Sequence, residues 1–199
     1  MAEREHPSTG NPWTILSSTR VYENGHIALV DHEVRNAAGA PSRYGIVHFK
    51  ESGVRVLPVD AEGSVVLVGQ YRLGVGAYTW ELPAGGRPSS ERPDRAAARE
   101  LQEEVGVAAR TWLPLLHLIS CGSVTDETPM AYLAWDLEPR ERTLDESEVI
   151  ALRHEPFAEV VRMALSGEIR DTSSIAAILA AHVKAQLGEL PEAVARHLR

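Results

Sequence analysis

The sequence GGRPSSERPDRAAARELQEEVGV, residues 85–107, changes the character of the chain near its midpoint. Two glycines open the segment, Pro93 suits the first turn of a helix, and the alanines that follow favour helix. A glycine near the end of the segment is a typical helix stop. Within the segment, apolar residues recur at every fourth position and so share one face; these are Ala97, Leu101 and Val105. The segment therefore predicts an amphipathic helix that packs on a core.

The same helix carries three closely spaced carboxylates. Glu100 and Glu104 stand at i and i+4, with Glu103 beside them. Like charges at this spacing repel each other by a few tenths of a kcal/mol per exposed pair, so a helix without a special demand usually interleaves lysines. A cluster of carboxylate oxygens suits Mg²⁺ or Mn²⁺. Taken alone, however, the cluster is also typical of a solvated acidic helix face.

The spacing of the whole segment decides between these two interpretations. It fills every defined position of a known motif, at Gly85, Glu91, Arg99, Glu100, Leu101, Glu103, Glu104, Gly106 and Val107. In this respect the chain resembles the Nudix hydrolases, whose signature is a loop–helix–loop that holds a divalent metal. The resemblance implies hydrolysis of a nucleoside diphosphate linked to another group.

The resemblance also implies a metal site. Glu100 and Glu104 would be the principal ligands of Mg²⁺, or of Mn²⁺ in its place, with Glu103 assisting. The backbone carbonyl of Ala84 would join them, because Gly85 allows a tight turn there. A metal so placed neutralises developing charge on a diphosphate and acidifies a bound water.

Three further residues of the motif have structural roles by the same resemblance. Glu91 and Arg99 would brace the loop against the helix through a salt bridge or hydrogen bonds. Gly106 would end the helix.

The resemblance extends over most of residues 50–185 and is strongest to the ADP-ribose and nucleotide-sugar pyrophosphatases. It implies that Arg72 and Glu81 line the substrate cleft, with Arg72 as a phosphate contact. Ser120-Cys121-Gly122-Ser123 departs from the Ser-Pro-Gly stretch that is usual in ADP-ribose hydrolases. The preferred nucleotide sugar therefore stays open.

A second acidic segment, residues 144–157, is similar to the loop that supplies the general base in this family. Glu146 and Glu148 match its two acidic positions, and the resemblance does not settle which of them takes the proton. A loop that closes over the substrate is a reasonable source of a base. The alternative is a polar turn before a helix.

Composition narrows the function class. The chain has 199 residues and a net charge of −8, from 20 basic and 28 acidic side chains. This charge argues against nucleic acid and anionic membranes as partners. The single cysteine excludes an intrachain disulfide, and we see neither a signal peptide nor a membrane span. We therefore expect a cytoplasmic protein.

The order of elements predicts an α/β (α+β) fold, a sandwich of helices around a mixed sheet with an additional N-terminal antiparallel sheet. Strands are expected at residues 14–22, 26–34, 44–50, 54–60, 64–72, 77–83, 111–120 and 130–138. Two helices follow, over residues 156–167 and from 171 onward.

We divide the chain into residues 1–50, 51–187 and 188–199, which are a strand region, the hydrolase domain and a C-terminal tail expected to form a short, loosely held helix. The strand region would expose apolar residues such as Ile15, Ile27, Leu29 and Val34. The resembled subfamily swaps this sheet across a twofold axis, which implies a homodimer.

The sequence thus predicts a Mg²⁺-dependent pyrophosphohydrolase of ADP-ribose or a related nucleotide sugar. A hydrolase of another nucleoside diphosphate or of a triphosphate is one alternative. A nucleotide-sugar sensor without activity is another, although such modules tend to lose the carboxylates that are complete here.

Overall fold

A computed structural model describes residues 10–144 and 149–199 of the chain. The chain divides into two compact units, residues 1–50 with 121–126 and residues 51–120 with 127–199. Among the described helices, none is both long enough and apolar enough to span a bilayer.

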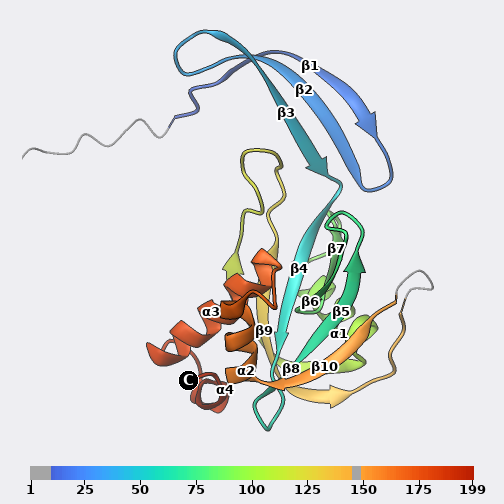
Figure 1. Cartoon of the computed structure of the whole chain (residues 1–199), viewed down its shortest axis with the longest axis vertical. Coiled ribbons are helices and arrows are strands. Elements are labelled where there is room, and N and C mark those ends of the chain that lie inside the picture. Colours follow the sequence, from blue (N-terminus) through green and yellow to red (C-terminus); the bar gives the residue numbers. More distant parts are fainter. Residues whose placement is uncertain (1–9, 145–148) are drawn as a thin grey trace, which may run out of the picture. The chain divides into compact units, whose positions relative to one another are not determined.

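The first unit is a three-stranded antiparallel sheet in the order β1-β2-β3 (Figure 1). Its strands are β1 (Thr14–Glu23), β2 (Ile27–Arg35) and β3 (Pro41–Phe49). Strand β1 is exposed along its whole length and has two register irregularities where it pairs with β2. Four apolar residues of this region were expected to be exposed. Ile15 is exposed, but Val34 is buried, and Ile27 and Leu29 are half-buried.

The second unit contains two sheets, of which the larger has the order β7-β4-β9-β8. Its strands are β4 (Glu51–Pro58), β7 (Ala84–Pro88), β8 (Val107–His117) and β9 (Met130–Pro139). Strands β4 and β9 are parallel, and the other neighbours are antiparallel. The smaller antiparallel sheet has the order β10-β5-β6, from β5 (Ser64–Arg72), β6 (Ala77–Glu81) and β10 (Ala151–Pro156).

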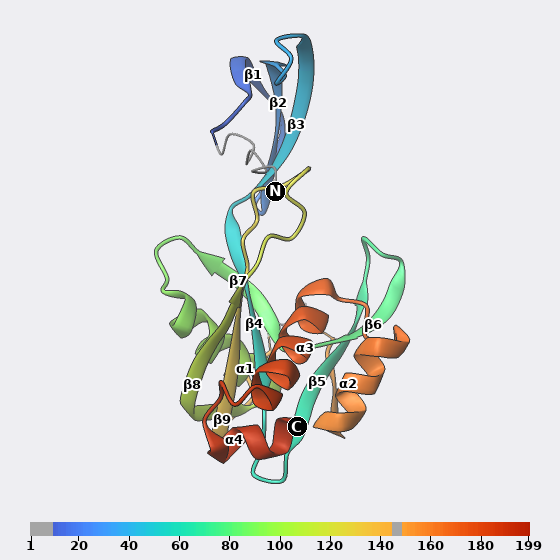
Figure 2. The same cartoon turned by 90° about the vertical axis from the view of Figure 1, so that its left-hand side faces the viewer.

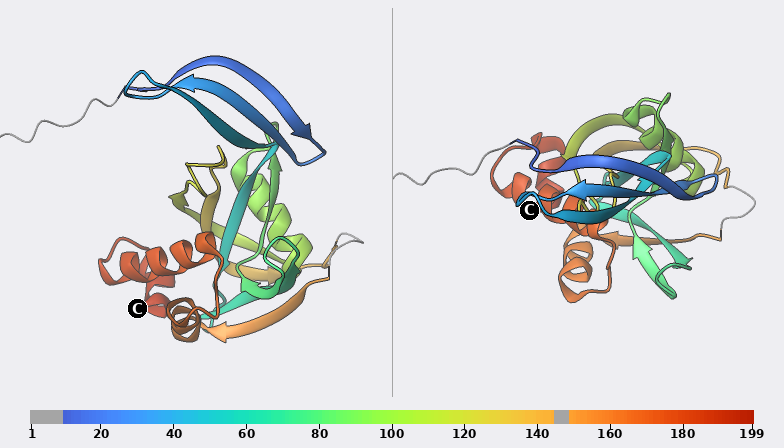
Figure 3. Two further views of the ribbon diagram at one scale, coloured as in Figure 1. Left: turned by 45° about the horizontal axis from the view of Figure 1, so that its top comes forward. Right: turned by 90° about the horizontal axis from the view of Figure 1, so that it is seen from above.

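Helices cover both sides of these sheets (Figures 2 and 3). They are α1 (Pro93–Val105), α2 (Phe157–Ser166), α3 (Thr172–Gln186) and α4 (Glu192–Leu198). Because side chains alternate along a strand, Leu57 and Leu67 enter the core beneath α2–α4, whereas Val56 and Val66 enter the core beneath α1. The expected α/β sandwich is confirmed.

Two short strands were not expected from the sequence. Residues 151–156, part of the segment that resembled a loop, form β10 and pair with β5 in continuous antiparallel register. Strand β7 begins at Ala84 and pairs with β4. Its sequence, Ala-Gly-Gly-Arg-Pro, lacks the β-branched and aromatic residues that usually indicate a strand.

The short helix expected at the C-terminal end is present as α4, but it is not loosely held. Residues 190–198 bury four apolar side chains in the core beneath α2 and α3, which are Leu190, Val194, Ala195 and Leu198. Leu190 lies just before the short helix α4, and the spacing of Val194, Ala195 and Leu198 places these three on one face of the helix. The backbone carbonyl of Leu198 also accepts a hydrogen bond from His182 Nδ1 at 2.7 Å.

This packing predicts that Leu198→Ala lowers the free energy of unfolding by about 2–5 kcal/mol, since it empties a fully buried site. Leu187→Ala is the matched control, because the Leu187 side chain is 66% exposed. The control should change the unfolding free energy by less than about 0.5 kcal/mol in urea denaturation. Equal effects of the two substitutions would contradict the packing of α4.

Candidate active site

Helix α1 is the platform of the candidate site. Pro93 lies in its first turn, and Gly106 ends it in the left-handed conformation with φ 76°. The expected core stripe is buried, but so are two carboxylates, since Glu100 is 8% exposed and Glu104 only 2% exposed. These two side chains do not form a solvated acidic face, because buried carboxylates need partners.

The partners of the buried carboxylates come first from the backbone around β7. The amide of Ala84 donates a hydrogen bond to Glu104 Oε2 at 2.7 Å. The carboxylate of Glu100 packs so closely on Gly85 that a Cβ at this position would overlap it. Gly85 is therefore required for the close approach of a side chain. Gly85 lies within strand β7, and its φ is not in the left-handed region, so the contact with Glu100 is the observed demand for glycine here.

Arg99 supplies the positive charge of the cluster. Its guanidinium donates to Glu91 at 3.0 and 3.3 Å, to Glu100 at 2.7 Å, to Glu103 at 2.9 Å and to the carbonyl of Gly86 at 2.9 Å. The hydrogen bonds to Glu91 are the main cause that raises the pKa of Arg99 above its ordinary value. The guanidinium thus connects the loop before α1 to the acidic face of the helix.

The donor set fits a hard divalent cation. Glu100, Glu103 and Glu104 offer only oxygen atoms, and the close fit of Glu100 on Gly85 brings a carboxylate to the backbone that begins β7. Within the described residues, no three acidic, His or Cys side chains converge as a preformed metal cluster. Instead the carboxylates accept hydrogen bonds from Arg99 and from the Ala84 amide. A bound metal would either share the carboxylates with these donors or displace the donors.

Strands β5 and β6 bring a second charged pair together. Arg72 donates two hydrogen bonds to Glu81, at 3.0 and 2.6 Å, and the hydroxyl of Thr79 donates to the same carboxylate. The hydrogen bonds to Glu81 raise the pKa of Arg72. Thr79 and Glu81 are buried, whereas Tyr78 on the other face of β6 is exposed. The two residues expected to line the cleft are therefore direct partners.

Sequence reasoning missed a polar network at the start of α3. Asp171 caps this helix by accepting from the Ser174 amide at 2.7 Å, and it also accepts from the Ser174 hydroxyl at 2.6 Å. Arg55 on β4 reaches the same carboxylate at 3.4 Å. Burial alone would raise the pKa of Asp171, but the charge of Arg55 and the bonds from Ser174 hold it below its ordinary value. The sequence predicted only that a helix begins near Asp171, and it did not indicate the contacts with Ser174 and Arg55.

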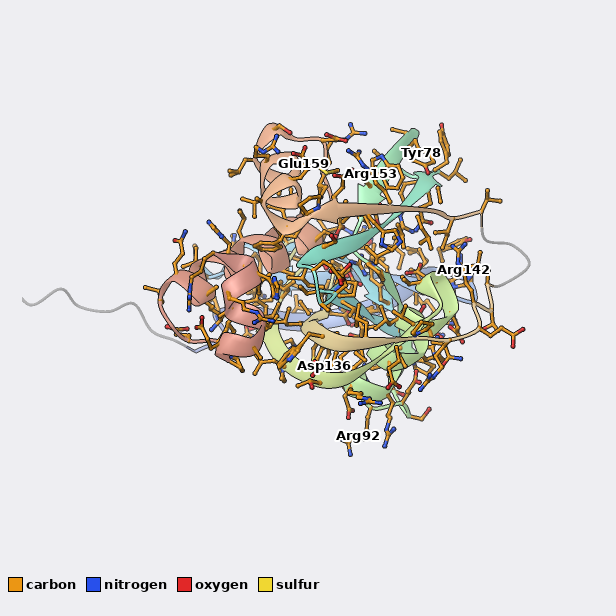
Figure 4. All side chains as sticks on the ribbon, turned by 90° about the horizontal axis from the view of Figure 1, so that it is seen from below. Tyr78, Arg92, Asp136, Arg142, Arg153 and Glu159 are labelled. Atoms are coloured by element: carbon orange, nitrogen blue, oxygen red, sulfur yellow. The ribbon has the colours of Figure 1, made fainter. Side chains whose placement is uncertain are left out.

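The acidic segment after β9 is only partly described. Glu146 and Glu148 lie outside the described residues. Arg142, labelled in Figure 4, donates to the carbonyl of Glu104 at 2.5 Å and to the carbonyl of Ile150 at 3.1 Å. Its guanidinium therefore joins Ile150, within this segment, to the last turn of α1.

Comparisons with known proteins agree with this arrangement. The family model of the NUDIX domain matches residues 50–177. An ADP-ribose pyrophosphatase of Mycobacterium tuberculosis (strain ATCC 25618 / H37Rv) is 36% identical over 171 residues, which cover 84% of this chain and 82% of that protein. An ADP-ribose pyrophosphatase of Bacillus subtilis (strain 168) is 29% identical over 166 residues, which cover 82% and 89%.

A solved structure described as an ADP compounds hydrolase has the same fold. It matches with a TM-score of 0.80 at 21% identity, over 92% of this chain and 100% of the other.

The network at α3 generates a prediction about pH. Asp171→Asn should lower the free energy of unfolding at neutral pH by about 1–3 kcal/mol, because it weakens bonds to a partly buried carboxylate. The pKa of this group is lowered on folding from 3.8, so its contribution is present above that value and is lost as pH falls through the lower folded pKa. The difference between wild type and variant should therefore shrink below about pH 4 in urea titrations.

Asp94→Asn is the control for this experiment, since Asp94 pairs with Arg92 on the exposed surface. Its effect at neutral pH should be much smaller. A difference between wild type and Asp171→Asn that stays constant from neutral to acid pH would contradict the assignment.

Proposed function

Because the chain belongs to the Nudix family, we propose that it hydrolyses the diphosphate of ADP-ribose or of a related nucleotide sugar. The products are a nucleoside monophosphate and a sugar phosphate. The observation that carries this proposal is the pair of buried carboxylates, Glu100 and Glu104, packed on the backbone of β7 in a chain with a complete Nudix motif. The two relatives named ADP-ribose pyrophosphatase support the choice of substrate.

Members of the Nudix family generally use divalent metal ions. In this proposal Glu100 and Glu104 hold Mg²⁺ together with the carbonyl of Ala84, and Glu103 assists. Such an ion would neutralise charge on the diphosphate and lower the pKa of the attacking water. Arg99 holds Glu100 and Glu103 in place through the hydrogen bonds described above.

The substrate is bound next to this cluster by Arg72. A guanidinium is suited to phosphate because it presents several donors in one plane. Glu81 already occupies two of those donors and so fixes the plane of the guanidinium, which leaves the remaining donors to contact a phosphate. Glu81, only 3% exposed, is thereby an orienting residue for Arg72.

Proton removal from the water is assigned to Glu146 or Glu148. The support is the resemblance of their segment to the family's catalytic loop, together with the contact of Arg142 to the carbonyls of Glu104 and Ile150. A positioned general base contributes about 10²- to 10⁴-fold to a rate.

One experiment tests the function and separates these roles. Wild type should release AMP from ADP-ribose with Mg²⁺ or Mn²⁺ and should lose this activity in excess EDTA. Glu104→Gln should weaken metal binding in calorimetry and lower kcat, whereas one of Glu146→Gln and Glu148→Gln should lower kcat by about 10²- to 10⁴-fold with metal binding retained. The other loop variant is the internal control.

The outcomes discriminate between the alternatives. Turnover that survives EDTA would refute the metal assignment. Activity on other nucleoside diphosphates or on triphosphates, without AMP release from ADP-ribose, would change the assigned substrate. Binding of ADP-ribose without hydrolysis would indicate a sensor. Near wild-type kcat in both loop variants would place the base elsewhere, with Glu103 as the first candidate.

The same proposal includes a homodimer formed through the N-terminal sheet. This sheet and the residue just before it expose large apolar side chains, which are Trp13, Ile15, Leu16, Val21, Tyr22 and Phe49. An apolar surface of this kind is typical of a protein–protein contact. Light scattering should give about twice the monomer mass of 21.8 kDa. Leu16→Asp should shift the mass toward the monomer, and Thr19→Asp on the same exposed strand should not; a monomeric wild type would refute the dimer.

A further inference from the structure

The two residues that link β6 to β7, Leu82 and Pro83, and the first residue of β7, Ala84, are held from three directions. The amide of Leu82 donates to Ser174 Oγ in α3 at 3.0 Å. The carbonyl of Pro83 accepts from a β4 amide at 2.9 Å, and the amide of Ala84 donates to Glu104 in α1 at 2.7 Å. Consecutive residues are therefore tied to three different elements, which fixes the path of the backbone as it enters β7.

The contact from α3 is directional. Ser174 is completely buried, and its hydroxyl donates to Asp171 Oδ1 at 2.6 Å. Because the hydroxyl hydrogen is committed to this carboxylate, a lone pair of the oxygen is left for the amide of Leu82. Arg55 holds the far side of the network through its contact with Asp171.

The link connects the two halves of the candidate site. Glu81, which orients Arg72, immediately precedes Leu82, and Gly85, which packs on Glu100, follows three residues after Leu82. Arg55 lies opposite Ala84 in the register of β4 and β7. The side chain of Arg55 therefore supports, through Asp171 and Ser174, the same stretch of backbone that its main chain pairs with.

We propose that Ser174 is a positioning residue for the metal site, which acts by fixing the Leu82–Ala84 backbone. The inference rests on the proposed function. Loss of the Ser174 hydroxyl leaves the buried amide of Leu82 without its acceptor, and this part of the backbone then moves to find another one. Such a movement displaces the carbonyl of Ala84 and loosens the bond from its amide to Glu104.

The experiment measures metal binding directly, with Mn²⁺ titrated into the full chain without substrate and free Mn²⁺ followed by electron paramagnetic resonance. Ser174→Ala should weaken binding by about tenfold, which corresponds to the loss of roughly one hydrogen bond. Ser174→Thr keeps the hydroxyl and should restore most of the affinity. Ser173→Ala is the matched control in the same helical turn, since the Ser173 side chain makes no hydrogen bond to the described part of the chain.

Two further variants separate positioning from stability. Leu198→Ala removes packing at α4 in the core that also contains Leu82, but it leaves the hydrogen bonds of the link in place, so it should lower the unfolding temperature and leave Mn²⁺ affinity unchanged. Ser174→Cys preserves the size of the side chain with a much poorer hydrogen-bond acceptor. It should bind Mn²⁺ more weakly than wild type, and it decides the question if Ser174→Ala does not fold.

Failure of the inference and failure of the proposed function are distinguishable. If Glu104→Gln weakens Mn²⁺ binding and the folded Ser174 variants bind like wild type, the metal site stands and the role of Ser174 is refuted. If Leu198→Ala weakens binding as much as Ser174→Ala does, Ser174 has only a structural role. If wild type and Glu104→Gln bind equally, the metal site itself is wrong and the inference falls with it.

Discussion

The arrangement of this protein depends on keeping two carboxylates inside it. Glu100 and Glu104 are almost fully buried on the face of α1 that packs toward β7. A buried charge is strongly unfavourable unless hydrogen bonds and opposite charges replace water. Arg99 and the amide of Ala84 provide this replacement, and both are available only when β7, the loop before α1 and the helix meet in one geometry. A cluster of like charges thereby specifies the fold around it.

Strand β4 makes that geometry possible. It pairs with β7 on one edge and with β9 on the other, and both of its faces are covered, since Leu57 and Val56 enter different cores. A strand held in this way has little freedom to move, so it is a rigid reference for β7. The helices α1 and α3 each contribute one side chain that fixes the backbone between β6 and β7. Glu104 of α1 accepts from the amide of Ala84, and Ser174 of α3 accepts from the amide of Leu82.

Much of this could be read from the sequence, because the informative residues follow simple periods. The order of the expected strands and helices predicted the sandwich correctly, and the stripe of Ala97, Leu101 and Val105 predicted the position of α1. The pairing of Arg72 with Glu81 required only that two neighbouring strands form a hairpin. Periodicity and motif spacing are local properties, so they are visible in a single sequence.

The structural features that could not be predicted from the sequence depend on contacts between segments that are distant in the chain. Strand β7 is composed of residues with low strand propensity and exists because β4 offers it hydrogen bonds. Ser174 looks like an ordinary residue near a helix cap, and nothing in the sequence links it to Leu82, which lies 92 positions earlier. The short apolar repeat of α4 was too brief to separate a packed helix from a frayed one.

The burial of α4 has a consequence for how the protein is made. The core beneath α2 and α3 closes only when Leu190, Val194, Ala195 and Leu198 are in place, and these residues are synthesised after all the strands and helices that they pack against. Until then the nascent chain carries an open apolar surface next to completed strands. Partly folded chains with such surfaces aggregate readily and are the usual clients of chaperones. The yield of soluble protein is therefore expected to depend on a segment that contributes no residue to the candidate active site.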